Sequence, residues 1–162
     1  GEALKTAIAQ ARAENIIWID ADDTYPTELL PKVRQAFRTY DMVVCSRKYG
    51  QENIPSFNRV GNFIFRTMIK AIYNFKPYDP CSGLYGAKKS HLKMMNLSAH
   101  RFAIEPEISI KGARMRLKML DIPIQYKARV GKAKLNSIIV GFEDLWTILR
   151  LIFWHPAKVG NG

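Results

Sequence analysis

Two carboxylates stand one residue apart directly after a short apolar run. Asp20 and Asp22 follow residues 16–19, whose β-branched and aromatic side chains predict a buried strand. A carboxylate pair at a strand end can hold Mg²⁺ or Mn²⁺, because both ions prefer oxygen ligands and keep coordination positions open for phosphate. The alternative is an acidic turn that only leads into the helix predicted after Thr27, and the spacing alone does not separate the two.

The same loop also resembles the nucleophile motif of haloacid-dehalogenase-type phosphatases. On that interpretation Asp20 attacks phosphorus and Asp22 acts as the general acid. Such an enzyme needs a second acidic pair at a later strand end to complete its magnesium site. The later aspartates all stand apart from any second aspartate: Asp41, Asp79, Asp121 and Asp144. The phosphatase interpretation therefore lacks half of its site.

Helical and strand-like apolar spacings alternate along the chain, which predicts an α/β fold. The expected helices lie near residues 2–13, 27–37, 60–72, 88–96 and 104–115. The expected strands lie near residues 16–19, 41–47, 84–87, and 117–120 with 122–126, either as a pair or as one broken strand. Thr27 is the expected N-cap of the second helix, because its hydroxyl can accept a hydrogen bond from the first turn.

The composition is that of one folded domain with an anionic partner. The chain has 162 residues, 48% of them hydrophobic, and carries 25 Lys and Arg against 14 Asp and Glu, a net charge of +11. Such an excess favours nucleic acid, a phosphorylated small molecule or an acidic lipid. Cys45 and Cys81 lack the number and spacing of a disulfide framework or zinc site, which favours a reducing compartment.

A further set of segments follows one order along the chain: residues 20–26, 41–47, 59–62, 79–83, 104–108, 122–126 and 129–135. In this order and spacing they resemble family 2 glycosyltransferases of the GT-A fold, in particular the polyprenyl-phosphate and dolichyl-phosphate hexosyltransferases. The resemblance implies a doubly wound mixed sheet flanked by helices. It also implies that the family's N-terminal strands, which bind the nucleobase, precede Gly1, so that this chain alone is not expected to hold a nucleotide sugar.

The resemblance implies a reaction in which a hexose moves from a UDP- or GDP-linked donor to polyprenyl or dolichyl phosphate, with inversion. The acceptor phosphate is itself the nucleophile, so catalysis depends on positioning and on stabilising the departing diphosphate. Mg²⁺ or Mn²⁺ is the implied cofactor, and the cytoplasmic face of a membrane is the implied location. Three histidines fit no catalytic set: His91, His100 and His155.

The resemblance also assigns roles to particular residues. Asp20 and Asp22 are the implied ligands of the metal and the diphosphate-sugar. Glu105 and Glu107 match the segment that lines the sugar site, and Asp79 is the implied catalytic or sugar-orienting carboxylate. The cations implied for the acceptor phosphate are Arg47, Arg59, Arg129 and Lys134.

Two positions depart from the closest members of that group. Thr24 replaces a glutamine two residues after the acidic pair, and Ala133 replaces a serine before the final lysine. Threonine is a poorer contact for metal or phosphate than glutamine, and alanine lacks the hydroxyl that serine supplies. These departures bear on metal and acceptor binding, and they leave the reaction class unchanged.

The resemblance divides the chain into residues 1–137, the C-terminal two-thirds of a GT-A domain, and residues 138–162, an amphipathic helix and tail. The helix lies either in a membrane interface or on the sheet, and both interpretations stay open. The alternatives to an enzyme are an incomplete GT-A scaffold and a basic nucleic-acid-binding module. The second lacks any nucleic-acid motif, and a packing face is expected for the apolar residues Phe63, Ile64, Met68 and Ile72.

Overall fold

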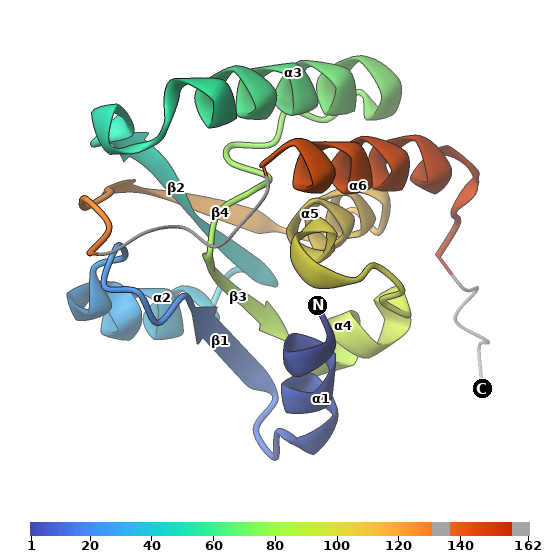
Figure 1. Ribbon diagram of the computed structural model, residues 1–162. Coiled ribbons are helices and arrows are strands. Elements are labelled where there is room, and N and C mark those ends of the chain that lie inside the picture. Colours follow the sequence, from blue (N-terminus) through green and yellow to red (C-terminus); the bar gives the residue numbers. More distant parts are fainter. Residues whose placement is uncertain (131–136, 157–162) are drawn as a thin grey trace.

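A computed structural model describes residues 1–130 and 137–156 and shows a mixed sheet flanked by helices (Figure 1). The four strands are β1 (Asn15–Ile19), β2 (Met42–Tyr49), β3 (Leu84–Lys88) and β4 (Met119–Gln125), arranged in the order β1-β3-β2-β4. Strand β3 runs antiparallel to both β1 and β2, whereas β2 and β4 are parallel. This arrangement confirms the predicted α/β fold.

Six helices accompany the sheet in the part of the chain that the structure describes. They are α1 (Glu2–Gln10), α2 (Leu30–Ala36), α3 (Ser56–Tyr73), α4 (Lys89–Met95), α5 (Ile104–Arg114) and α6 (Ser137–Arg150). Short 3-10 turns lie at Thr27–Leu29, Gln51–Asn53, Arg101–Ala103 and Leu151–Phe153.

The inner strand β2 is apolar on both faces, because helices cover both sides of the sheet. Met42 and Val44 pack in a core with α4 and α5, whereas Val43 and Cys45 pack in a second core with α2. A third core lies among α3, α5 and α6, and its buried residues are Phe65, Ile69, Ile110, Ile148 and Leu151. Helices α3 and α6 therefore form a layer over α5 (Figure 1).

Several element boundaries differ from those predicted. The first helix ends at Gln10, and Thr27 begins a 3-10 turn without a side-chain cap. Strand β1 is half-buried, because it lies at the end of the described sheet. The two segments near residues 117–126 form the single strand β4, where Pro123 is tolerated because β4 is also an edge strand.

A glycine in the middle of β3 allows α2 to approach the sheet closely. A Cβ atom on Gly86 would lie 2.8 Å from Phe37 Cζ and 3.0 Å from Val33 Cγ1. Both distances are shorter than ordinary van der Waals contact, so any side chain at this position would push α2 away from the sheet.

We expect Gly86→Ala to lower the free energy of unfolding by about 1–3 kcal/mol, the usual cost of overpacking a core. Gly61→Ala on α3 is the matched control, because its new Cβ would have nothing within 4 Å. That control should be neutral or stabilising by up to about 1 kcal/mol. Urea denaturation of both variants measures the effect, and equal midpoints would contradict the tight contact between α2 and β3.

Candidate active site

The acidic loop after β1 is attached to the start of β3. The backbone N–H of Asp20 donates to the carbonyl oxygen of Gly83 at 3.0 Å, and the N–H of Gly83 donates to the Tyr25 hydroxyl at 2.6 Å. Because β1 and β3 are antiparallel, the end of one strand meets the start of the other, with Ile19 opposite Leu84. This pairing fixes the position of the loop that carries the acidic pair.

Gly83 leaves the space that the Asp20 carboxylate occupies. A Cβ atom at position 83 would lie 2.0 Å from Asp20 Oδ2, which no side chain could accommodate without moving the carboxylate. Gly83, predicted only as part of a loop motif, therefore has a specific steric role beside the acidic pair.

The two carboxylates of the acidic pair have different surroundings. Asp20 is exposed, and within the described residues its side chain has no hydrogen-bond or ion-pair partner; partial desolvation and the nearby charge of Asp22 raise its pKa. Asp22 accepts hydrogen bonds from the Thr24 hydroxyl at 2.6 Å and from Arg129 Nε at 2.8 Å, with a second from Arg129 Nη2. Desolvation raises the pKa of Asp22, but these hydrogen bonds outweigh it and hold that pKa below its usual range.

Glu105 lies close enough to the acidic pair to interact with it electrostatically. This side chain is half-buried at the start of α5. Burial, with smaller contributions from the charges of Asp20 and Asp144, raises the pKa of Glu105 to about 8. Glu105 is therefore mostly protonated at neutral pH and can donate a hydrogen bond.

Glu107 does not share the position predicted for it beside Glu105. Residues two apart on a helix project from nearly opposite sides, so Glu107 points into the protein. Its carboxylate is fully buried, pairs with Lys111 Nζ at 2.6 Å and accepts hydrogen bonds from the backbone N–H groups of Ser98 and Ala99. These contacts hold α5 against the preceding loop, and the role of Glu107 in the sugar site stays a prediction.

Arg47 and Asp79, predicted to serve the acceptor and the sugar separately, form one buried ion pair. Asp79 Oδ2 accepts from Arg47 Nε at 2.6 Å and from the Arg47 backbone N–H at 3.1 Å. Asp79 Oδ1 accepts from Arg47 Nη2 at 2.8 Å and from the Cys81 N–H at 3.3 Å. Burial raises the pKa of Asp79, but the Arg47 charge outweighs it and keeps the carboxylate ionised. Each side chain is 11% exposed and uses its charged group mainly on the other, and the predicted roles of both residues toward a substrate stay predictions.

The remaining predicted acceptor cations differ in position. Arg129 contacts the acidic pair directly, as described above. Arg59 is exposed on α3, where its Nη2 donates to the Ser56 hydroxyl at 3.0 Å, and no contact joins it to the acidic pair in the described structure. Lys134 and Ala133 lie outside the described residues. Of the predicted set, Asp22 and Arg129 are in direct contact, and Asp20 lies within electrostatic range of Asp22, Arg129, Arg47 and Glu105.

Three residues that support the site were not predicted as functional. The hydroxyl of Tyr25 accepts a hydrogen bond from the Gly83 N–H, and the Ser82 hydroxyl donates one to the carbonyl oxygen of Cys45 at 2.6 Å. Thr24, noted only as a departure, orients Asp22. Thr24 and Tyr25 are buried although they lie in a polar loop. The only feature of the sequence that could have predicted this burial is the aromatic residue within the acidic segment.

The carboxylates present suit a divalent cation that brings its own phosphate ligands. In residues 1–130 and 137–156, no group of three or more His, Cys, Asp or Glu side chains is placed to hold a metal ion. Two neighbouring carboxylates, one of them unpaired, supply part of a hard-oxygen shell and leave positions for phosphate oxygens. The fit therefore depends on a diphosphate as the second source of ligands.

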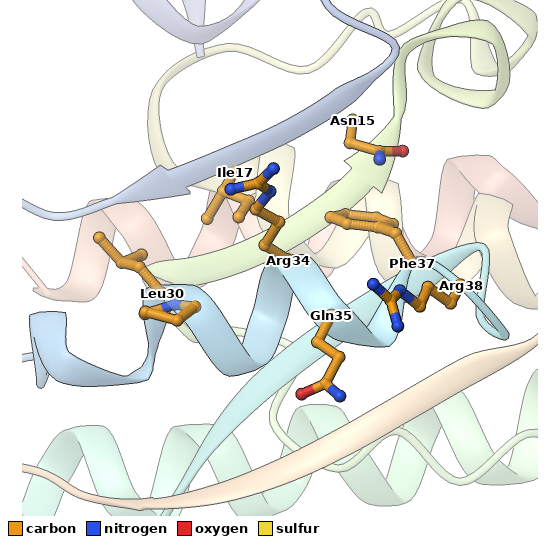
Figure 2. A pocket seen from close by; sticks show the side chains of 8 residues that line it. Asn15, Ile17, Leu30, Arg34, Gln35, Phe37 and Arg38 are labelled. Carbon is orange, nitrogen blue, oxygen red and sulfur yellow. The ribbon is translucent and has the colours of Figure 1, made fainter.

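A separate groove runs between β1 and α2, and no residue of the acidic pair lines it (Figure 2). Its lining residues are Asn15, Ile17, Leu30, Pro31, Arg34, Gln35, Phe37 and Arg38.

The fold and the sequence identify the family. Residues 1–97 match the model of glycosyl transferase family 2, and the chain belongs to this family. It is 27% identical over 143 residues to the dolichyl-phosphate hexose transferase of Haloferax volcanii, an alignment that covers 87% of this chain and 62% of that protein. It is also 27% identical over 155 residues to the dolichol-phosphate mannosyltransferase of Pyrococcus furiosus, covering 90% of this chain and 43% of that one. The chain thus spans about half the length of these relatives.

A solved structure supports the GT-A fold. Glucosyl-3-phosphoglycerate synthase from Mycobacterium tuberculosis, crystallised with Mn²⁺, UDP and phosphoglyceric acid, superposes with a TM-score of 0.74 at 19% identity. The superposition covers 97% of this chain and 55% of that chain. At this identity the likeness shows the fold, and the GT-A architecture predicted from the sequence is confirmed.

We expect Asp79→Asn to destabilise the fold, because it leaves the buried Arg47 guanidinium without its counter-charge. Removing one partner of a buried pair costs about 3–5 kcal/mol. The double variant Arg47→Met with Asp79→Leu should recover most of this loss, since no charge then remains buried. Urea denaturation measures all variants. An unchanged unfolding midpoint for Asp79→Asn would contradict the stabilising role of the ion pair.

We expect Arg129→Gln to tighten Mn²⁺ binding in the absence of a donor, because Arg129 neutralises the same carboxylate that a cation would use. An exposed ion pair contributes about 0.2–1 kcal/mol, so the affinity should rise about 1.4- to fivefold. Titration followed by electron paramagnetic resonance of free Mn²⁺ measures it. Lys127→Gln is the matched control, since Lys127 lies 3.8 Å from the neighbouring Asp23. Equal affinities in the two variants would contradict competition at Asp22.

Proposed function

We propose that this chain forms part of a hexosyltransferase that moves a sugar from a nucleotide diphosphate to the phosphate of a polyprenol. The observation that carries the proposal is the acidic pair at the end of β1, with one carboxylate unpaired and the other beside Arg129. The names of the relatives support a polyprenyl phosphate as the acceptor. Two relatives are named as a dolichyl-phosphate hexose transferase and a dolichol-phosphate mannosyltransferase, and one from Micrococcus luteus is named as an undecaprenyl-phosphate mannosyltransferase.

The residues of the site suit this chemistry. An oxygen of the acceptor phosphate attacks the anomeric carbon, the bond from that carbon to the diphosphate breaks, and the nucleoside diphosphate leaves with the electron pair. Asp20 and Asp22 would hold Mg²⁺ or Mn²⁺, which supplies charge stabilisation to the leaving diphosphate. Arg129 adds a positive charge at the same place, and protonated Glu105 can donate a hydrogen bond to a sugar hydroxyl.

The proposed location is the cytoplasmic face of a membrane, where the protein is peripheral. A polyprenyl phosphate is a membrane lipid with its phosphate at the surface, so transfer takes place at a bilayer. The free thiols of Cys45 and Cys81 are consistent with a reducing compartment on that side. The donor is proposed as a UDP- or GDP-hexose.

The test is transfer by the full-length gene product. The protein is incubated with polyprenyl phosphate and a panel of UDP- and GDP-hexoses, with Mn²⁺ or Mg²⁺ and again with EDTA. Glycolipid should form only with the metal, and Asp22→Asn should lower kcat about 100-fold or more, the scale expected for losing a group that stabilises the leaving charge. Asp23→Asn is the matched control, because this neighbouring carboxylate is exposed and 3.8 Å from its lysine partner.

The outcomes separate the alternatives. Transfer that is equal in Asp22→Asn and Asp23→Asn would contradict the assigned site but not the reaction. Absence of transfer from every donor would contradict the reaction and favour a GT-A scaffold without activity.

A further inference from the structure

The chain that carries Arg129 leaves the sheet at the end of β4 and passes beside the acidic loop (Figure 1). We call residues 126–130 the post-β4 segment. It belongs to no helix or strand, yet Arg129 Nε donates to Asp22 Oδ2 at 2.8 Å. Because irregular backbone has many accessible conformations, contacts with other parts of the protein must hold this segment in place.

Three hydrogen bonds fix the first two residues of the post-β4 segment. The backbone N–H of Tyr126 donates to the carbonyl oxygen of Tyr49 at 2.9 Å, and the N–H of Lys127 donates to the carbonyl oxygen of Thr24 at 3.0 Å. The carbonyl oxygen of Tyr126 accepts from Asn53 Nδ2 at 2.9 Å. Of these three partners, Asn53 alone uses its side chain, so a substitution there removes one attachment and leaves the backbone bonds in place.

Gly50 allows the turn that carries Asn53 to approach the post-β4 segment. It precedes the 3-10 turn Gln51–Asn53 and has a φ of 73°, in the left-handed region that favours glycine. A Cβ atom at position 50 would also lie 2.1 Å from the carbonyl oxygen of Tyr126. Both the backbone conformation and the close approach therefore require glycine here, and both bring Asn53 to the same carbonyl group.

The ring of Tyr126 adds a side-chain attachment to the same place. It meets the Tyr25 ring edge-on, with 5.4 Å between the centroids, and its centroid lies 5.6 Å from the Arg47 guanidinium carbon. Such aromatic and cation–π contacts are favourable and depend on orientation. Tyr126 is thus held to the acidic loop and to β2 at once.

Arg129 follows two residues after the last of these backbone hydrogen bonds. Two residues span at most about 7 Å, so the anchor at Lys127 limits where the Arg129 backbone can lie. In the described structure the Asn53 side chain makes no hydrogen bond to the acidic pair. Its effect on that site therefore passes through the post-β4 segment and the residue that this segment carries to Asp22.

We propose that Asn53 is a positioning residue that, together with Gly50, holds the post-β4 segment so that Arg129 lies beside Asp22. The inference rests on the proposed function, in which Arg129 adds a positive charge where the diphosphate leaves. A charge stabilises a transition state most effectively when its position is fixed before the reaction. The attachment itself involves neither donor nor transfer, so the two proposals can fail separately.

The first measurement is amide hydrogen exchange of the full-length protein without donor, acceptor or metal. Asn53→Ala should accelerate exchange of the Lys127 N–H about two- to tenfold, because the segment loses one hydrogen bond. Gln51→Ala is the matched control, since this side-chain amide also donates to a backbone carbonyl, but to that of Arg47 on β2 at 3.3 Å. Exchange of the Tyr85 N–H in β3 verifies that global stability is unchanged.

The second measurement is a double-mutant cycle in the transfer assay. Asn53→Ala should lower kcat about two- to tenfold, but it should have no effect in the Arg129→Gln background, because the group that it positions is then absent. A loss of folded protein would lower kcat equally in both backgrounds. Asn53→Asp keeps the size of the side chain and removes the donor, so it should lower kcat at least as much as Asn53→Ala.

Each outcome bears on the proposal. Faster Lys127 exchange, with a kcat effect that Arg129→Gln abolishes, supports it. Unchanged Lys127 exchange would overturn the attachment, and equal kcat effects in both backgrounds would overturn its action through Arg129. Absence of transfer from every donor would contradict the proposed function, and Mn²⁺ titration then decides the positioning. Asn53→Ala should tighten Mn²⁺ binding by up to about fivefold, the limit for complete loss of the Arg129 ion pair, whereas unchanged affinity would overturn the proposal.

Discussion

The buried ion pair between Arg47 and Asp79 is the constraint on which the geometry of the site depends. It joins the end of β2 to the loop before β3 and uses both oxygens of the carboxylate. The Ser82 hydroxyl of the same loop donates a hydrogen bond to β2, and the carbonyl oxygen of Gly83 accepts one from the N–H of Asp20 in the acidic loop. These three connections fix the position of the acidic pair relative to the inner strand. A buried pair is seldom the most stabilising solution, but it fixes the loop before β3 to the inner strand through directional hydrogen bonds.

The site itself keeps a negative charge without a partner. The pKa of Asp20 is raised because the side chain is partly desolvated and lies near the charge of Asp22. The absence of a side chain at Gly83 leaves the space that the Asp20 carboxylate occupies. Such an arrangement costs stability, and natural folds retain costs of this kind mainly where they serve binding. Arg129 forms hydrogen bonds only with the second carboxylate, so Asp20 keeps its oxygens available to a cation, and an anion can bind beside Arg129.

The sequence was sufficient for features that depend on local pattern and insufficient for those that depend on distant neighbours. Apolar spacing predicted the alternation of helices and strands, and the acidic loop was correctly placed after β1. Arg47 and Asp79 are 32 residues apart, so nothing local showed that each would neutralise the other. Glu107 looked equivalent to Glu105 in the sequence. The two side chains project from nearly opposite sides of α5, and which side faces the protein interior is known only once the neighbours of the helix are known. On α3, periodicity revealed apolar residues but could not show which of them the other helices cover, and Phe63, expected in the packing face, is exposed.

Helix α5 connects the surroundings of the acidic pair to the core beneath α3 and α6. The charge of Asp20 acts on Glu105 in the first turn of α5, and Ile110 farther along packs in the core shared by α3 and α6. The buried Glu107–Lys111 pair between these points ties α5 to the loop after α4. Because this one helix contacts both regions, it holds α3 and α6 at a constant position relative to the acidic pair. The proposed transfer depends on positioning more than on any single reactive group, and a fixed arrangement of this kind supplies it.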